Sequence, residues 1–230
     1  MFYILELIKD LSFTEAVIVF FAFALALMFA LIIHEYMHAY VAVKQGDMTP
    51  KAYGRLTFNP SAHFDIVGLL CFIIVGFGWA KPVPINTLNF KNHRRGVVLV
   101  SLAGICANVL IAFFLIPLLI LITPSVIPVI ATGVENFSDA VLLFLEEFIS
   151  ISITINLFLA LFNIIPIYPL DGFNFLNAFL RYDNKFVGFM TRYGTILLLI
   201  LIFSGVLPWV LQEASEFIQT AFLKFWYIFF

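Results

Sequence analysis

The chain has 230 residues, of which 63% are hydrophobic and 11% are charged, and its formal net charge is −2. Soluble domains contain roughly 45–50% apolar and about 25% charged residues, so this composition excludes a soluble globular protein and indicates a polytopic membrane protein. The small net charge gives no general attraction to nucleic acid, and we expect no nucleic-acid partner. The two cysteines, Cys71 and Cys106, lack the C-x-x-C spacing of a thiolate metal site.

Four apolar segments are long enough to cross a bilayer, which takes about 20 residues in a helix. They lie at about 14–43, 97–123, 140–163 and 187–206, and Pro124 and Pro208 end the second and the fourth. Residues 1–13 and 209–230 mix polar and aromatic side chains, which predicts amphipathic helices at the membrane interface; a short fifth span is an alternative for 209–230. We therefore expect one all-α membrane domain over 1–230, with its core at about 14–208.

A polar insertion separates the first and second spans. Glycine and proline interrupt 44–63 and 80–96, and apolar residues within them predict short strands over 47–60 and 80–90 that pair as a β-hairpin. The apolar segment 64–79 between them is short for a crossing, so we expect it to re-enter the membrane. Re-entry also places the basic residues of the insertion on one side, as the positive-inside rule prefers: Lys44, Lys51, Arg55, Lys81, Lys91, Arg94 and Arg95.

The first span contains the motif H-E-x-x-H, with His34, Glu35 and His38. Positions i and i+4 share a helix face, so both imidazoles can reach one metal ion, and Glu35 is placed to take a proton from a water that the metal activates. Ionisable side chains are costly inside a membrane span and usually mark a functional site. The alternative is two core histidines bonded to carbonyls and a glutamate that reaches the interface.

A catalytic zinc site normally has three protein ligands and one open position, so a third ligand is needed. Asp171 is the best candidate, because Pro166, Pro169 and Gly172 stop the third span beside it, on the side of the membrane where His38 lies. The alternative is that Asp171 caps a helix-end turn. Four other side chains are candidate ligands: His63, His93, Glu146 and Glu147.

These motifs resemble the site-2 protease family of intramembrane zinc metalloproteases. The resemblance rests on H-E-x-x-H and on N-x-x-P-x-x-x-L-D-G from Asn163 to Gly172. Further similarities are G-x-x-x-N at Gly104 and Asn108, Asn59-Pro60 with His63, and the stretch from Gly78 to Pro84, and together these cover about 20–180. The chain looks most like compact bacterial members without a PDZ or CBS domain. The resemblance implies that His34, His38 and Asp171 bind one zinc ion (Zn2+), that Glu35 is the catalytic acid/base, and that Asn163 holds substrate or stabilises the oxyanion.

The expected function is therefore intramembrane zinc endopeptidase, acting within or near a transmembrane segment of another protein. The expected partners are a transmembrane protein or peptide substrate and the lipid bilayer, and the expected location is a bacterial cytoplasmic membrane with the active site toward the cytoplasm. A metal-binding membrane protein without catalysis, or a scaffold, is the alternative. Glu35 favours the enzyme, because a pure metal binder has little need of that acid. Asn163 and Asn108 could instead hold helices together.

Overall fold

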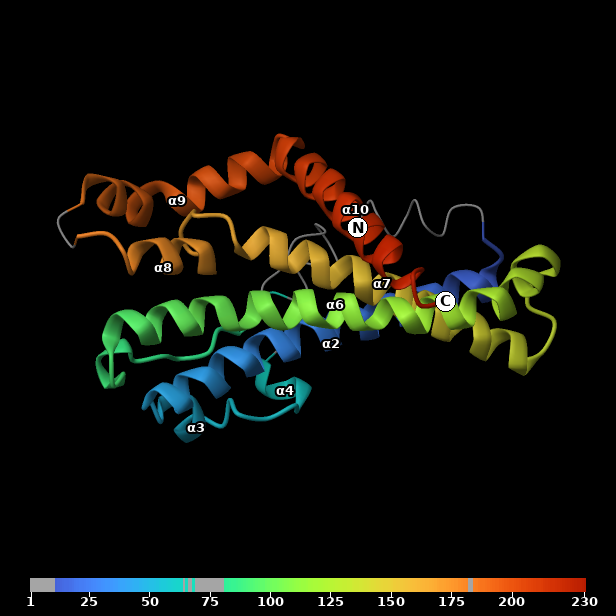
Figure 1. The fold of residues 1–230 in the computed structure, drawn as a ribbon, viewed down its shortest axis with the longest axis horizontal. Helices are drawn as coiled ribbons and strands as arrows, with labels where there is room; N and C mark the ends of the chain where they lie inside the picture. The colour runs from blue at the N-terminus through green and yellow to red at the C-terminus, as the bar shows by residue number, and fades with distance from the viewer. Residues whose placement is uncertain (1–10, 64, 66–67, 69–80, 182–183) are drawn as a thin grey trace.

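The computed structural model describes residues 11–63, 65, 68, 81–181 and 184–230, and these residues are predominantly helical (Figure 1). Helices α2, α6, α7 and α9 are long and apolar enough to cross a membrane, which confirms the prediction of about four spans. The described elements are α2 (Phe13–Gln45), α3 (Thr49–Ala52), α4 (Pro60–His63), the 3-10 helix η1 (Thr87–Asn89), α6 (His93–Thr132), α7 (Phe137–Asn163), α8 (Asp171–Asn177), α9 (Lys185–Phe203) and α10 (Val206–Trp226).

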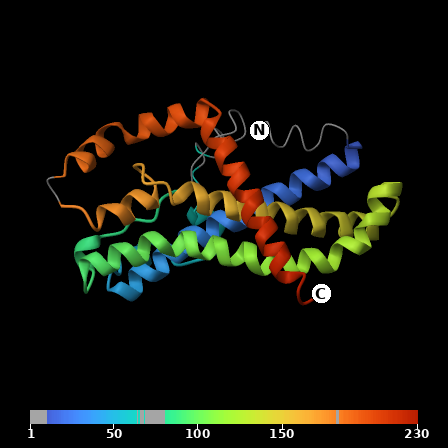
Figure 2. The same cartoon turned by 45° about the horizontal axis from the view of Figure 1, so that its top comes forward.

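The core of the protein is a bundle of α2, α6 and α7, which lie side by side in both views (Figures 1 and 2). Small residues on α2, among them Ala22 and Ala26, are fully buried and pack with Ile151 of α7. On the other side of α7, Ile153 and Leu157 form a second buried cluster with α6. Small residues allow close helix approach, which is the main source of helix association inside a membrane.

Helix α6 is longer than the sequence predicts, because it continues through Pro124 to Thr132. The prediction that Pro124 ends the second span is therefore wrong. Proline lacks an N–H, but a membrane helix tolerates it where another donor satisfies the freed carbonyl. Such a donor is present at Pro117: the carbonyl of Phe113, one turn earlier, accepts a hydrogen bond from the indole N–H of Trp226 at 2.9 Å.

The C-terminal segment forms helix α10, which crosses α7 and α6 (Figures 1 and 2). Pro208 does not end a helix, since it lies in the first turn of α10, where the helix needs no N–H donor. The helix is amphipathic as expected: Leu211 is buried and Phe222 packs on the α6–α7 cluster, whereas Glu213 is exposed. Its apolar face therefore packs against the helix bundle. Residues 1–10 of the interfacial helix expected at 1–13 lie outside the described residues. Phe13 is already the first residue of α2.

The β-hairpin predicted in the insertion is wrong for the described residues, which contain no strand in 47–60 or 81–90. Pro50 lies in the first turn of the short helix α3, where its fixed φ angle fits. Residues 81–86 have irregular backbone, and Pro82 and Pro84 have no N–H to donate to a strand ladder. The re-entrant element predicted at 64–79 lies outside the described residues, apart from Asp65 and Gly68.

Asp47 lies just after the end of α2 and binds residues 86–89, where the irregular segment 81–86 ends. Its buried carboxylate accepts hydrogen bonds from the Thr49 N–H at 3.1 Å and hydroxyl at 2.6 Å, and from the Asn86 N–H and the Asn89 side-chain amide at 2.8 Å each. Burial raises the pKa of this carboxyl, but the hydrogen bonds from Thr49, Asn89 and Asn86 outweigh burial, and the net pKa is lowered. The ionised carboxylate is therefore the form that the fold requires.

We expect Asp47→Ala to lower the free energy of unfolding by about 2–4 kcal/mol at neutral pH, because it leaves several donors unpaired. A folded-state pKa below the unfolded value means that this stabilisation is complete above about pH 4 and is lost as the pH falls through the folded pKa. Thermal unfolding in detergent should therefore show a difference between wild type and variant that is large at pH 7 and shrinks in acid. Glu213→Gln, at an exposed site on α10, is the control, and a pH-independent difference would contradict the prediction.

Candidate metal centre

Three potential metal-binding atoms converge between α2 and α8. His34 and His38 lie one turn apart on α2, and their Nε2 atoms are 3.0 Å apart. Asp171 is the first residue of α8, and its Oδ2 lies 3.2 Å from His34 Nε2 and 3.0 Å from His38 Nε2. In the described part of the chain, this is the group of side chains close enough together to hold a metal ion.

The second nitrogen of each imidazole faces an acceptor on another helix. His38 Nδ1 lies 2.8 Å from the carbonyl of Val100, which can only accept, so this nitrogen carries the proton. His34 Nδ1 lies 2.9 Å from the side-chain oxygen of Asn108, whose amide donates to Asn156 at 3.0 Å. Both Nε2 atoms of the neutral rings are therefore left with bare lone pairs, as a metal site requires.

The donor set fits a zinc ion. Asp171 Oδ2 is buried and has no hydrogen-bond donor, so three electron-pair donors face one another without a proton between them. Two ligands about 2.0–2.2 Å from one tetrahedral zinc ion lie roughly 3.3–3.6 Å apart. The observed separations of 3.0–3.2 Å are slightly shorter than this range. One cation placed among the three atoms would satisfy all of them.

Glycines bring the helices that carry these residues into close contact. A Cβ atom on Gly104 of α6 would lie 2.5 Å from Cε1 of His34, so only glycine leaves room for this imidazole. A Cβ on Gly172 of α8 would overlap the carbonyl of Ile164, at the end of α7. The N-cap of α8 is Leu170, so the alternative that Asp171 caps the turn is wrong.

The candidate centre opens into a cleft of about 260 Å³. Glu35 and Asn163, the other two predicted site residues, both line it. Asn163 is the last residue of α7, and its amide donates one hydrogen bond to the carbonyl of Leu159 at 2.9 Å. The remaining lining residues come from the segment 82–85 and from α6 and the α8 region: Pro82, Val83, Ile85, Val100, Ser101, Pro169 and Asn174.

The other candidate ligands lie outside this cluster. His63 is fully buried in α4, and its Nε2 donates to the carbonyl of Thr57 at 2.7 Å. His93 is the exposed first residue of α6, and Glu146 and Glu147 lie in the middle of α7.

Three residues at or beside the centre were not predicted from the sequence: Val100, Asn156 and Asn174. The sequence could have pointed to Asn156, because a polar side chain inside an apolar span usually has a partner there. It could not have pointed to Val100, because the contact is made by the backbone carbonyl and not by the side chain.

Two comparisons relate the chain to known proteins. The family model described as peptidase family M50 matches residues 22–201. The curated protein named "Putative zinc metalloprotease YwhC", from Bacillus subtilis (strain 168), is 44% identical over 143 residues. That alignment covers 62% of this chain and 62% of the relative, so the chain aligns with less than two thirds of the relative's length. No solved structure matches the chain.

We expect Gly104→Ala to lower zinc affinity about 10- to 100-fold, because the added methyl group displaces the His34 ring. The measurement is zinc content of detergent-purified protein against a graded chelator. Gly188→Ala is the matched control, since a Cβ at that helical glycine meets no atom within 4 Å. Wild-type zinc retention in a folded Gly104→Ala protein would show that the ring position does not matter for metal binding.

Proposed function

Because the chain belongs to peptidase family M50, we propose that it is an intramembrane zinc endopeptidase that cleaves within or near a transmembrane segment of other membrane proteins. In this proposal His34, His38 and Asp171 hold one zinc ion per chain, Glu35 is the catalytic acid/base, and Asn163 contacts the substrate. The observation that carries the proposal is the convergence of three electron-pair donors beside Glu35, in a cleft inside an apolar helix bundle.

In this proposal, each residue around the cleft has a separate role in peptide hydrolysis. When bound, zinc supplies a Lewis acid that polarises the scissile carbonyl and makes water a stronger acid. Glu35 accepts a proton from the attacking water and then delivers it to the leaving amine. Val100 and Asn108 hold the Nδ1 protons of the two imidazoles, which keeps both Nε2 lone pairs directed at the centre.

Asn163 is placed to act on the substrate backbone. Its side-chain amide has two hydrogens, and the carbonyl of Leu159 takes one. The second is available to a substrate carbonyl or to the oxyanion that forms there. Segment 82–85, through Pro82, Val83 and Ile85, forms the facing wall of the cleft, along which an unwound substrate segment can lie.

In the bacterial cytoplasmic membrane that we propose as the location, the distribution of basic residues supports an orientation with the cleft toward the cytoplasm. The end of α2 and the beginnings of α6 and α9 lie at one end of the bundle (Figure 1). Lys44, Arg94, Arg95 and Lys185 are at that end, and His38 lies six residues before Lys44. The opposite turn, 133–136, contains no lysine or arginine. This bias is the one that the positive-inside rule associates with the cytoplasmic side.

We expect Glu35→Gln to reduce cleavage of a co-reconstituted single-span substrate by about 10²–10⁴-fold, because it removes the proton acceptor. Zinc content should stay at the wild-type value, since Glu35 is not among the three converging donors. Product formation is followed by gel or mass spectrometry, with Glu213→Gln as the charge-matched control. Undiminished cleavage by Glu35→Gln would exclude Glu35 as the acid/base, and full zinc with no cleavage by wild type would favour a non-catalytic metal binder.

We expect wild-type protein to contain about one zinc per chain and Asp171→Ala to lose most of it, because a two-histidine site lacks the third ligand. Elemental analysis of protein purified under metal-replete conditions gives the ratio. Asp139→Ala, in the first turn of α7 at the far end of the bundle, tests for a general effect of losing an acid. Absence of zinc from correctly folded wild type would overturn the proposed site.

A further inference from the structure

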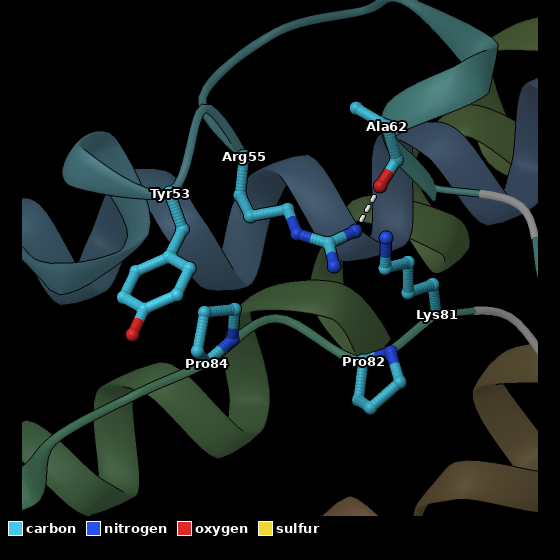
Figure 3. Close-up of a pocket in the computed structure, with 6 residues that line it drawn as sticks. All are labelled: Tyr53, Arg55, Ala62, Lys81, Pro82 and Pro84. Atoms are coloured by element: carbon cyan, nitrogen blue, oxygen red, sulfur yellow. Dashed lines mark hydrogen bonds between the residues drawn. The ribbon is translucent and has the colours of Figure 1, made fainter.

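A second pocket, of about 450 Å³, adjoins the metal cleft (Figure 3). It lies between the chain that connects α3 to α4 and the segment beginning at residue 81. Pro82 lines both this pocket and the metal cleft, so the two spaces share a wall. The lining residues are Tyr53, Arg55, Ala62, Lys81, Pro82 and Pro84, and we refer to this space as the basic pocket.

Two positively charged side chains converge in the basic pocket. Arg55 is only 7% exposed, and its guanidinium donates a hydrogen bond to the carbonyl of Ala62. The backbone N–H of Lys81 donates to the next carbonyl, that of His63, at 2.7 Å. The Lys81 side chain points toward the Arg55 guanidinium (Figure 3). The end of α4 therefore holds both cations beside the same space.

These two charges lack an anionic partner in the described part of the chain, where no carboxylate forms an ion pair with Arg55 or Lys81. Asp65 is the one acidic residue in the sequence 64–80, and its carboxylate accepts from the N–H of Gly68 at 2.9 Å. A buried guanidinium is costly unless it is paired, and Ala62 uses only one of its five N–H donors. The remaining donors and the lysine suit an oxyanion.

We propose that the basic pocket binds the carboxylate of an aspartate or glutamate in the peptide substrate, next to the bond that is cleaved. The inference rests on the proposed function, because it assigns the pocket to the same peptide that enters the metal cleft. The shared wall at Pro82 favours this occupant.

A lipid phosphate has similar chemistry but fits the pocket less well. The acyl chains of a phospholipid stay in the bilayer, so headgroup binding does not account for a pocket that shares a wall with the metal cleft. The side chain of a peptide that lies in the cleft can reach this pocket past Pro82. Arginine binds a carboxylate with two parallel hydrogen bonds.

The experiment exchanges charge at Lys81, which is exposed, because loss of the buried Arg55 could unfold the segment. The probe is a set of single-span model substrates in which one glutamate is moved through the positions around the cut, each paired with a glutamine version. At one position we expect wild type to cleave the glutamate substrate about tenfold faster in kcat/KM. Lys81→Glu should lose this preference and favour lysine there, whereas Lys51→Glu, an exposed lysine outside the pocket, should behave as wild type.

Equal cleavage of glutamate and glutamine substrates at every position would overturn the basic pocket as a substrate site while leaving the protease standing. A dependence of Lys81→Glu activity on phosphatidylglycerol in the vesicles, with no dependence on substrate charge, would assign the pocket to a lipid headgroup and also overturn it. Binding of fluorescent glutamate and glutamine peptides to Glu35→Gln protein gives a readout that needs no catalysis. A tighter glutamate complex that Lys81→Glu abolishes would support the pocket even if cleavage failed, and equal binding would reject it.

Discussion

The burial of two imidazoles inside an apolar bundle is the constraint on which the rest of the structure depends. A polar ring has no water to bond inside a membrane, so both nitrogens of each histidine need protein or metal partners. Val100 and Asn108 of α6 supply them on one side, and Asp171 approaches on the other. Helix α6 can come close enough only because Gly104 has no side chain at the His34 ring. The close approach of α2 to α6 is therefore what allows the two imidazoles to be held in position.

The hydrogen bonds extend this order away from the centre. Asn108 donates to Asn156 of α7, and Asn156 donates to the carbonyl of Ser152, so a chain of polar contacts crosses all three core helices. Each member satisfies its neighbour, which is the condition under which a buried polar network specifies one arrangement of helices. The same network fixes which nitrogen of His34 faces Asp171. Helix packing and imidazole orientation are coupled in this way.

The insertion after α2 is organised by individual hydrogen bonds instead of by a sheet. The Asp47 carboxylate accepts from the N–H of Asn86, the Arg55 guanidinium donates to the carbonyl of Ala62, and the backbone N–H of Lys81 donates to the carbonyl of His63. The segment 81–86 therefore lies between the metal cleft and the basic pocket and lines both. Prolines within the segment exclude a strand ladder, yet they also hold the chain extended. The wall between the cleft and the pocket is therefore built from prolines and specific hydrogen bonds, without regular secondary structure.

The sequence by itself determined the number of spans and the candidate centre, because both depend on local signals. A run of about 20 apolar residues sets a span, and the i, i+4 spacing of His34 and His38 sets their common face. Only the tertiary structure decided how the carbonyl freed by Pro117 is satisfied, because its donor, the indole of Trp226, comes from the other end of the chain. It alone brought Asn108 to His34, 74 residues away, and Arg55 to Lys81. Contacts between distant residues depend on helix packing, and no local pattern encodes them.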